Sequence, residues 1–255
     1  MLHDNNQILL VEYRQPFLSK DKIDREKFYE DCSRIFKIIT KQQINELWDL
    51  TLQATEQKHG TMLVISENAK SEAKRLGKQS FAIKPLKLTP KIINQITSID
   101  GSVMLDIDST CHAIGVILDG LATEKGDSSR GSSYNSAIRY YENFNTQFSM
   151  AIVIISEDGM IDIIPKLRPR IKHSEITNRL YELEKLNLLE KVERKKYYSI
   201  INWFENNEFY LSDNECLKIN ELRKEIEKKE AEPANMWIVR KDLVSNSEMN
   251  DSYYK

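Results

Sequence analysis

Three short polar segments near the middle of the chain contain residue types that bind phosphorylated ligands. The first is Asp100-Gly101-Ser102. A carboxylate at such a turn can coordinate a divalent metal ion, and the glycine lets a ligand lie against the backbone. Because Asp-Gly is also among the commonest turn pairs, the segment taken alone is consistent with an ordinary turn as well.

The second segment enters a predicted helix with a glycine followed by hydroxyl side chains. It reads Arg130-Gly131-Ser132-Ser133-Tyr134-Asn135-Ser136-Ala137. The free N–H groups and the positive dipole end of a helix N-terminus attract phosphate. A serine cap on an ordinary helix is the alternative explanation.

The third segment, Ser156-Glu157-Asp158-Gly159, follows an apolar run. Its carboxylates would be able to share a metal ion with Asp100 if the chain brought the two segments together. The alternative is a surface hairpin, because glycine at the end of a polar run is typical of turns.

These segments lie between elements whose hydrophobic patterns predict an α/β fold. Short apolar runs bounded by glycine or polar turns are typical of buried strands, and helical spacing occurs between them. Strands that alternate with helices indicate a sheet covered by helices on both faces. Two strand pairs joined by short turns predict a mixed central sheet. The predicted strands are 61–66, 81–83, 102–107, 112–118, 150–155 and 160–164.

Composition divides the chain into three parts. Residues 24–57 carry apolar residues at helical spacing, and residues 1–57 are expected to be an N-terminal helical segment. Residues 58–168 contain the predicted sheet, and six of the eight glycines lie within 101–159. Tight loops and a ligand cradle are expected there. Residues 169–255 predict a mainly helical region with a late strand near 236–240.

The totals describe a soluble globular protein of the cytoplasm. Hydrophobic residues make up 40% and charged residues 30% of the chain, and the net charge of −2 favours neither nucleic acid nor a membrane surface as a partner. Cys32, Cys111 and Cys216 form no metal-binding or disulfide pattern. No signal peptide is expected, and no apolar run is long enough to cross a bilayer.

The order of the three polar segments resembles the diadenylate cyclase (DAC) family, which includes the nucleotide-binding domain of DNA-integrity scanning proteins. The family has an apolar strand after glycine, matched by Gly60-Thr-Met-Leu-Val-Ile-Ser66, and an Asp-Gly-Ala motif, matched by Asp100-Gly101-Ser102. Its Gly-Thr-Arg-His-Arg-x-Ala motif aligns with 131–137. A strand ending in Ser-Glu-Glu/Asp matches 154–158. The resemblance covers roughly 60–165.

The resemblance implies that two ATP molecules, held by two protomers of a homodimer, are joined into cyclic di-AMP with release of pyrophosphate. It implies Mg²⁺ or Mn²⁺ as the cofactor, with Asp100 and Glu157 as catalytic residues. The metal would be held by Asp100, Glu157 and Asp158. The expected nucleotide-binding residues are Gly101, Ser102, Arg130, Gly131, Ser132, Ser133, Tyr134, Asn135, Arg139 and Ser156.

The sequence departs from the family where the Arg-His-Arg triplet is expected. Ser133-Tyr134-Asn135 stands there, which removes two cations from the triphosphate site. Arginine forks bind phosphate with strong, directional hydrogen bonds. Arg139 lies one helical turn beyond Asn135 and is the best substitute, although a solvated helix residue is the alternative. Two functions therefore stay open: a divergent cyclase, or a nucleotide sensor without turnover.

Overall fold

The computed structural model describes residues 24–56, 59–122, 125–127, 130–157, 161–229 and 240–255, and the backbone of four short strands that precede them. The chain forms two compact units, Met1–Leu167 and Arg168–Lys255.

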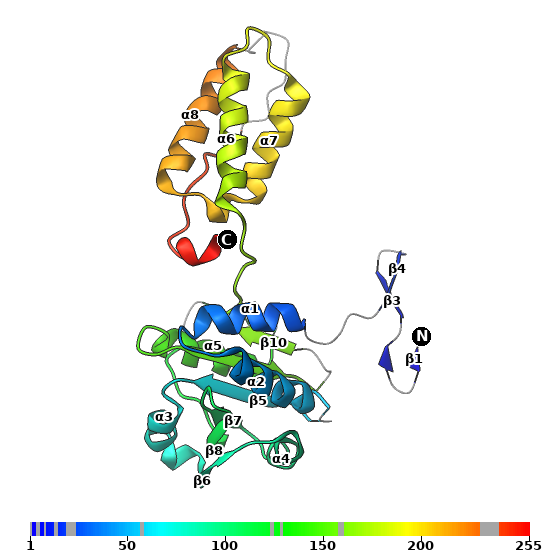
Figure 1. The fold of residues 1–255 in the computed structure, drawn as a ribbon, viewed down its shortest axis with the longest axis vertical. Helices are drawn as coiled ribbons and strands as arrows, with labels where there is room; N and C mark the ends of the chain where they lie inside the picture. Colours follow the sequence, from blue (N-terminus) through cyan, green and yellow to red (C-terminus); the bar gives the residue numbers. More distant parts are fainter. Residues whose placement is uncertain are drawn as a thin grey trace. The chain divides into compact units, whose positions relative to one another are not determined.

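A six-stranded mixed sheet is the centre of the first unit (Figure 1). The strand order is β10-β9-β5-β7-β8-β6. β5 and β7 are parallel, and all other neighbours in this sheet are antiparallel. The predicted mixed sheet is therefore confirmed. Its strands are β5 (Thr61–Ser66), β6 (Phe81–Lys87), β7 (Ser102–Leu105), β8 (Thr110–Val116), β9 (Met150–Ile155) and β10 (Ile161–Ile164).

Alternating side chains of the central strands enter two separate cores, because successive residues of a strand point to opposite faces. On β5, Leu63 and Ile65 belong to one buried cluster, and Met62 and Val64 belong to the other. Every residue of β5 is buried. Such an uninterrupted apolar run is expected of a strand that is covered on both sides.

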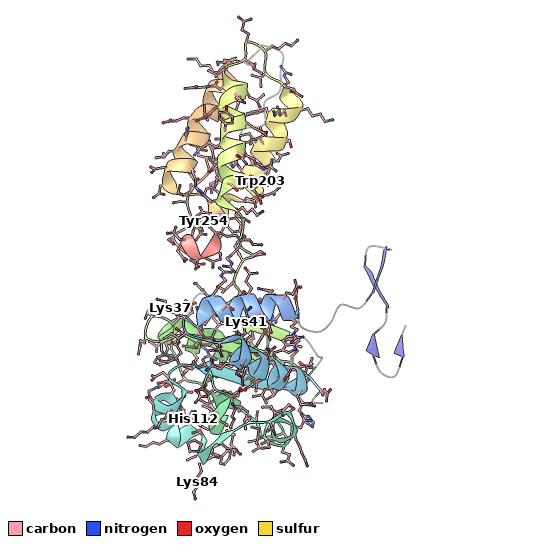
Figure 2. The ribbon with its side chains drawn as sticks, in the orientation of Figure 1. Lys37, Lys41, Lys84, His112, Trp203 and Tyr254 are labelled. Carbon is pink, nitrogen blue, oxygen red and sulfur yellow. The ribbon has the colours of Figure 1, made fainter. Side chains whose placement is uncertain are left out.

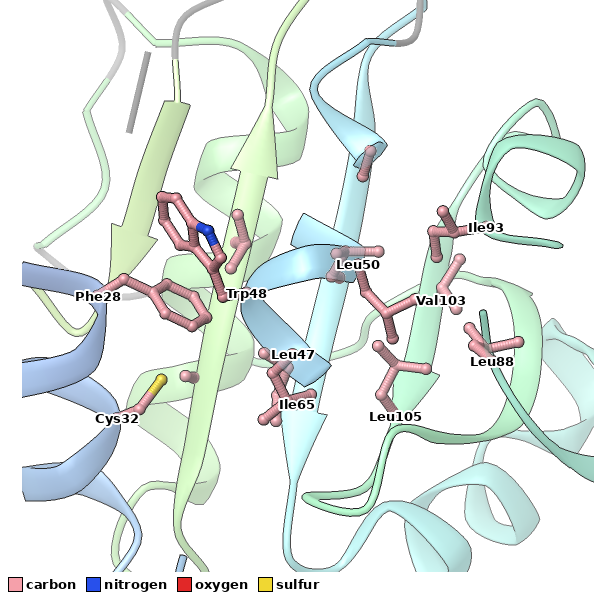
Figure 3. Packing of buried hydrophobic residues seen from close by; sticks show 14 of the residues in the cluster. Phe28, Cys32, Leu47, Trp48, Leu50, Ile65, Leu88, Ile93, Val103 and Leu105 are labelled. Atoms are coloured by element: carbon pink, nitrogen blue, oxygen red, sulfur yellow. The ribbon is translucent and has the colours of Figure 1, made fainter. Parts of the chain in front are cut away.

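Three helices cover the first face: α1 (Arg25–Ile35), α2 (Lys41–Ala54) and α4 (Pro90–Ile96). The rings of Phe28 and Trp48 meet edge to face with centroids 5.5 Å apart and pack over the sheet (Figure 3). The N-terminal helices thus share their hydrophobic core with the sheet.

The second face is covered by α3 (Ala69–Arg75) and α5 (Ser132–Phe144), and the 3₁₀ turn η1 (Gly77–Gln79) leads from α3 to β6. α5 packs against β9 and β10 and buries Ala137 and Tyr140. Helices therefore lie on both faces of the sheet, as the sequence pattern predicts.

The N-terminal segment 1–57, expected to be helical, becomes helical only at Arg25. Before that residue the backbone forms two antiparallel pairs. Residues 9–12 and 15–18 pair directly across a short connection, so the local pattern is that of a hairpin. The strands are β1 (Leu2–His3), β2 (Asn6–Gln7), β3 (Leu9–Glu12) and β4 (Gln15–Leu18).

Three helices form the second unit: α6 (His173–Asn187), α7 (Arg194–Asn206) and α8 (Asp213–Lys229). Short 3₁₀ turns follow at η2 (Glu208–Tyr210) and η3 (Asp251–Tyr253).

The end of the chain is fixed to these helices by hydrogen bonds. The Asn220 amide donates to the Leu243 carbonyl and accepts from the Leu243 N–H. The strand predicted near 236–240 lies outside the described residues except for Arg240, which is not in a strand. Among the described helices, none combines the length and apolarity needed to span a membrane.

Candidate functional site

Several strand ends meet at one edge of the sheet and form a hollow, which we call the strand-edge pocket. β5 and β7 begin at this edge, and β8 and β9, which run antiparallel to them, end there. The pocket has a volume of about 540 Å³, within the range of small-molecule sites. Its walls are residues 60–62, 78–81, 100–102, 115–118, 132, 133 and 136.

Two glycines in direct backbone contact form part of the pocket wall. Gly101 has φ +104° and Gly115 has φ +59°, conformations that favour glycine. A Cβ added to Gly101 would lie 2.7 Å from the carbonyl carbon of Gly115. A side chain at position 101 would therefore force β7 and β8 apart at the pocket.

The two neighbours of Gly101 have different roles. Asp100 lies at the exposed side of the pocket, and its carboxylate accepts a hydrogen bond from the Gly101 N–H at 2.9 Å. Ser102 is 1% exposed, and its hydroxyl donates to the Val116 carbonyl at 3.0 Å. Asp100 is thus available to a ligand, whereas the Ser102 hydroxyl joins β7 to β8.

The first turn of α5 forms another wall of the pocket. Ser132, Ser133 and Ser136 all line it, and Gly131 is the N-cap residue. Within the described part of the chain, no side chain caps this helix end. This helix end, with its backbone N–H groups and positive dipole, therefore has no capping side-chain oxygen and is the kind of site that attracts an anion.

Arg130 and Tyr134, both predicted to bind the nucleotide, lie outside the pocket lining. Arg130 forms an ion pair with Asp162 of β10, and its guanidinium lies 4.7 Å from the Tyr134 ring centroid. Lys166 binds the same carboxylate at 2.8 Å and lies 5.2 Å from the same ring. Attraction to Asp162 directs Arg130 toward β10.

Asn135 and Arg139 also make local contacts outside the pocket lining. The Asn135 amide donates to the carbonyls of Asp127 and Arg130 at 2.9 and 3.0 Å, and its oxygen accepts from the Asp127 N–H. Arg139 donates to the Asn135 carbonyl at 3.1 Å and to the Ser136 hydroxyl at 3.3 Å. Asn135 thus closes the loop before α5, and Arg139 does not take the place of the missing triplet in this conformation.

The third polar segment borders the pocket through Gly60. A Cβ on Gly60 would lie 3.5 Å from the Glu157 backbone nitrogen and 3.6 Å from its Cγ. Glu157 and Ser156 are both exposed. Asp158 lies outside the described residues. The segment is therefore at the same sheet edge as Asp100, as its position after β9 requires.

One wall of the pocket, formed by η1 and the start of β6, was not predicted from the sequence. Lys78 is there, and it is the one cationic side chain among the described residues that line the pocket. Phe81 is the one aromatic residue of that described lining. No local motif marks either residue, because the wall exists only after β6 has paired with β8.

A partly buried ion network connects α3, α5 and the chain after β8. Arg75 donates to both oxygens of Asp119, at 2.5 and 2.9 Å, and to Glu72 at 2.7 Å. The Tyr140 hydroxyl donates to the buried Glu72 carboxylate at 2.6 Å. The Arg75 guanidinium also lies 4.5 Å from the Phe144 ring centroid.

This network holds the pocket wall formed by residues 115–118 against α5, whose first turn forms another wall of the pocket. Asp119 directly follows 115–118, and Gly120 touches the α5 backbone, since a Cβ there would lie 2.9 Å from the carbonyl of Arg139. Hydrogen bonds from Arg75 hold the pKa of Asp119 below its usual value. Burial and the Glu72 carboxylate raise the pKa of Tyr140, which keeps its hydroxyl a donor.

The predicted metal site has a sparse protein donor set. Among the described residues there is no cluster of three or more His, Cys, Asp or Glu side chains suited to a metal ion. Mg²⁺ is commonly held by one or two carboxylates together with substrate phosphates and water. Asp100 at the pocket provides one carboxylate of the kind that this binding mode uses.

His112 lies on β8 (Figure 2). Its Nε2 lies 2.8 Å from the Asp106 carboxylate. Asp106 also accepts from the N–H groups of Asp108 and Thr110. His112 therefore contacts the turn between β7 and β8 through Asp106, and it is not part of the pocket lining.

We expect Gly101→Ala to lower the free energy of unfolding of the first unit by about 1–3 kcal/mol, because a positive φ and a backbone clash coincide at this position. Urea denaturation measures the change. Gly77→Ala is the control, since no described atom lies within 4 Å of its added Cβ, and a change within about 0.5 kcal/mol is expected. Equal effects of both variants would contradict the contact described for Gly101.

The Arg75–Asp119 pair predicts a specific pH dependence. Because the pKa of Asp119 is lowered in the fold, its stabilising effect is present above the unfolded pKa of about 3.9 and is lost as the pH falls through the folded value. Asp119→Asn should cost up to about 1 kcal/mol near pH 7, since the pair is partly exposed, and less below about pH 4. Urea denaturation at several pH values, repeated in an Arg75→Gln background, tests this. A cost that stays constant to pH 3, or persists without Arg75, would contradict it.

Comparisons with known proteins place the pocket within a described family. Residues 51–167 match the model of the DAC family, described as "DisA bacterial checkpoint controller nucleotide-binding". No curated protein sequence matches the chain.

Two solved structures are similar to part of this chain. One is a double mutant of DacA from Staphylococcus aureus, with 15% identity, a TM-score of 0.40, and coverage of 49% of this chain and 83% of that one. The other is a hypothetical membrane spanning protein from Bacillus cereus, with 19% identity, a TM-score of 0.38, and coverage of 52% and 64%. The family match includes all strands of the central sheet and every wall of the strand-edge pocket. The part of the chain that contains this sheet and pocket therefore matches the DAC family model.

Proposed function

We propose that the chain binds an adenine nucleotide in the strand-edge pocket and joins two ATP molecules into cyclic di-AMP or a related linked nucleotide. The observation that carries this proposal is that Asp100 and the serine-lined N-terminus of α5 line the same pocket of a DAC domain. We assign this activity to residues 58–168. The protein would act in the cytoplasm, where ATP is abundant and its three buried free cysteines would stay reduced.

The α5 wall is suited to the phosphates of the nucleotide. N–H groups at a helix N-terminus and nearby hydroxyls bind phosphate oxygens, and the helix dipole favours their negative charge. Ser132, Ser133 and Ser136 would supply the hydroxyls. Gly131 keeps this entrance free of a side chain.

Asp100 would act on the ribose 3′-hydroxyl and hold a divalent cation, with Glu157 as its neighbour at the sheet edge. When bound, Mg²⁺ or Mn²⁺ neutralises phosphate charge and polarises the reacting oxygen. The 3′-oxygen of each nucleotide forms a bond to the α-phosphorus of the other, the bond from that phosphorus to the oxygen bridging it to the β-phosphate breaks, and the two transfers release two pyrophosphates. The 3′-hydroxyl proton passes to a nearby base, for which Asp100 is our candidate.

One pocket provides half of the two-nucleotide reaction. The second ATP must then be held by a second copy, so we propose a homodimer in which two pockets face each other. Holding both nucleotides in line supplies much of the rate enhancement for such a transfer.

A nucleotide sensor without turnover is the second candidate function. The described pocket lining contains one cation, Lys78, and Arg130 is paired with Asp162. By analogy with removed oxyanion donors, the loss of charged clamps costs on the order of 10²–10⁴ in rate. A slow cyclase and a sensor are both compatible with this charge distribution, and the retained carboxylate at position 100 favours the cyclase.

Mass spectrometry of the reaction products separates these functions. We expect the full chain incubated with ATP and Mn²⁺ or Mg²⁺ to form a linked dinucleotide and pyrophosphate. Asp100→Ala should lower the rate at least about 100-fold, because it removes both the base and the metal ligand. Asp49→Ala, at an exposed position of α2 outside the pocket lining, is the control and should leave the rate unchanged.

The possible outcomes are distinct. Product formation that persists in Asp100→Ala would contradict the proposed role of this carboxylate. Tight ATP binding by the wild-type chain with no pyrophosphate release would identify the sensor. No binding of any adenine nucleotide would contradict both functions.

A further inference from the structure

The strand-edge pocket has chemically different ends. α5 brings hydroxyls and helix N–H groups from the side of β9 and β10, whereas the end of β8 and the first residue of β6 bring apolar side chains, next to the polar residues 78–80. Val116, Ile117 and Leu118 line this second side together with Phe81. A nucleotide has a matching polarity, because its phosphates are charged and its base has two apolar faces.

Phe81 is held in place while much of its ring stays exposed. It begins the edge strand β6 and is 62% exposed. A Cβ added to Gly115 would lie 2.7 Å from its Cδ2 and 2.9 Å from its Cε2, so the ring rests against the Gly115 backbone. Ile117 beside it is 64% exposed. The ring therefore has one part against the Gly115 backbone and an exposed surface at the pocket.

Gly115 therefore makes room for the ring. Its backbone touches Gly101 on one side and the Phe81 ring on the other. A larger residue at 115 would displace the ring from the pocket wall. Gly101 directly precedes β7, Gly115 lies on β8 and Phe81 begins β6, so β8 separates the ring from Asp100-Gly101.

We propose that Phe81 is the stacking platform for the nucleobase. This inference rests on the proposed function and extends it, because it orients the ligand: the base lies against the Phe81 ring, and the phosphates point to the first turn of α5. Stacking on an aromatic side chain tolerates any base, because every base has a π-face. The ring therefore orients the base, and its identity as a purine comes from the ATP of the proposed function.

Paired binding measurements test this assignment. Isothermal titration of the full chain with ATP and Mg²⁺, and separately with inorganic triphosphate and Mg²⁺, compares a ligand that has a base with one that lacks it. Phe81→Ala should raise the Kd for ATP about tenfold or more and leave the Kd for triphosphate within about twofold. Phe81→Trp should restore ATP binding, since an aromatic face is retained.

Leu86→Ala is the matched control. Leu86 is an exposed apolar residue of the same strand, but it is not part of the pocket lining. Its truncation should leave both Kd values unchanged. Thermal unfolding of each variant shows that the strand is intact.

Four results would overturn the inference. The first is an unchanged Kd for ATP in Phe81→Ala while the wild-type chain binds ATP, which would leave the proposed function standing. The second is an equal loss of ATP and triphosphate binding. The third is weaker self-association of Phe81→Ala in sedimentation velocity with an unchanged ATP affinity. That result would identify the ring as a contact with a second copy of this chain. The fourth, no ATP binding by the wild-type chain, would remove the proposed function as well.

Discussion

The backbone contact between Gly101 and Gly115 is the constraint on which the pocket depends. It lets β7 and β8 approach so closely that no side chain fits between them. Asp100 is thereby held at the sheet edge where β7 begins. The same contact leaves Gly115 open on its other side to the Phe81 ring. A carboxylate and an aromatic face are thus positioned by two residues that have no side chain.

A network of ion pairs and hydrogen bonds holds the α5 wall of the pocket in place. Arg75 bridges Glu72 and Asp119, and Tyr140 adds a hydrogen bond from α5 to the Glu72 carboxylate. A buried ion pair is weak evidence for stability, because desolvation offsets much of the attraction. The directional hydrogen bonds of this network nevertheless fix the relative positions of its side chains. In this chain they connect the segment after β8 with the helix whose first turn faces the pocket, so the network acts on the site without touching a ligand.

Local patterns in the sequence were enough to predict the sheet but not the complete pocket. The apolar run 61–66 predicts a buried strand, and the glycines in 101–159 predict tight loops near a ligand. The structure places Asp100, Gly101 and Ser132 at one pocket. Lys78 and Phe81 carry no such signal, since they reach the pocket only through pairing of β6 with β8. Helical spacing placed Arg139 on the same face as Asn135, but it did not reveal that both side chains bind their own helix and loop. The roles of the individual site residues stay predictions.

The central claim is that Asp100, the first turn of α5 and the Phe81 ring surround one nucleotide. A crystal structure of the full chain with Mn²⁺ and a non-hydrolysable ATP analogue tests it most directly, because anomalous scattering locates the metal independently of the ligand density. We expect a manganese peak beside Asp100, phosphates at Ser132 and Ser133, and the base against Phe81. An analogue bound on another surface, or a manganese peak remote from Asp100, would contradict it.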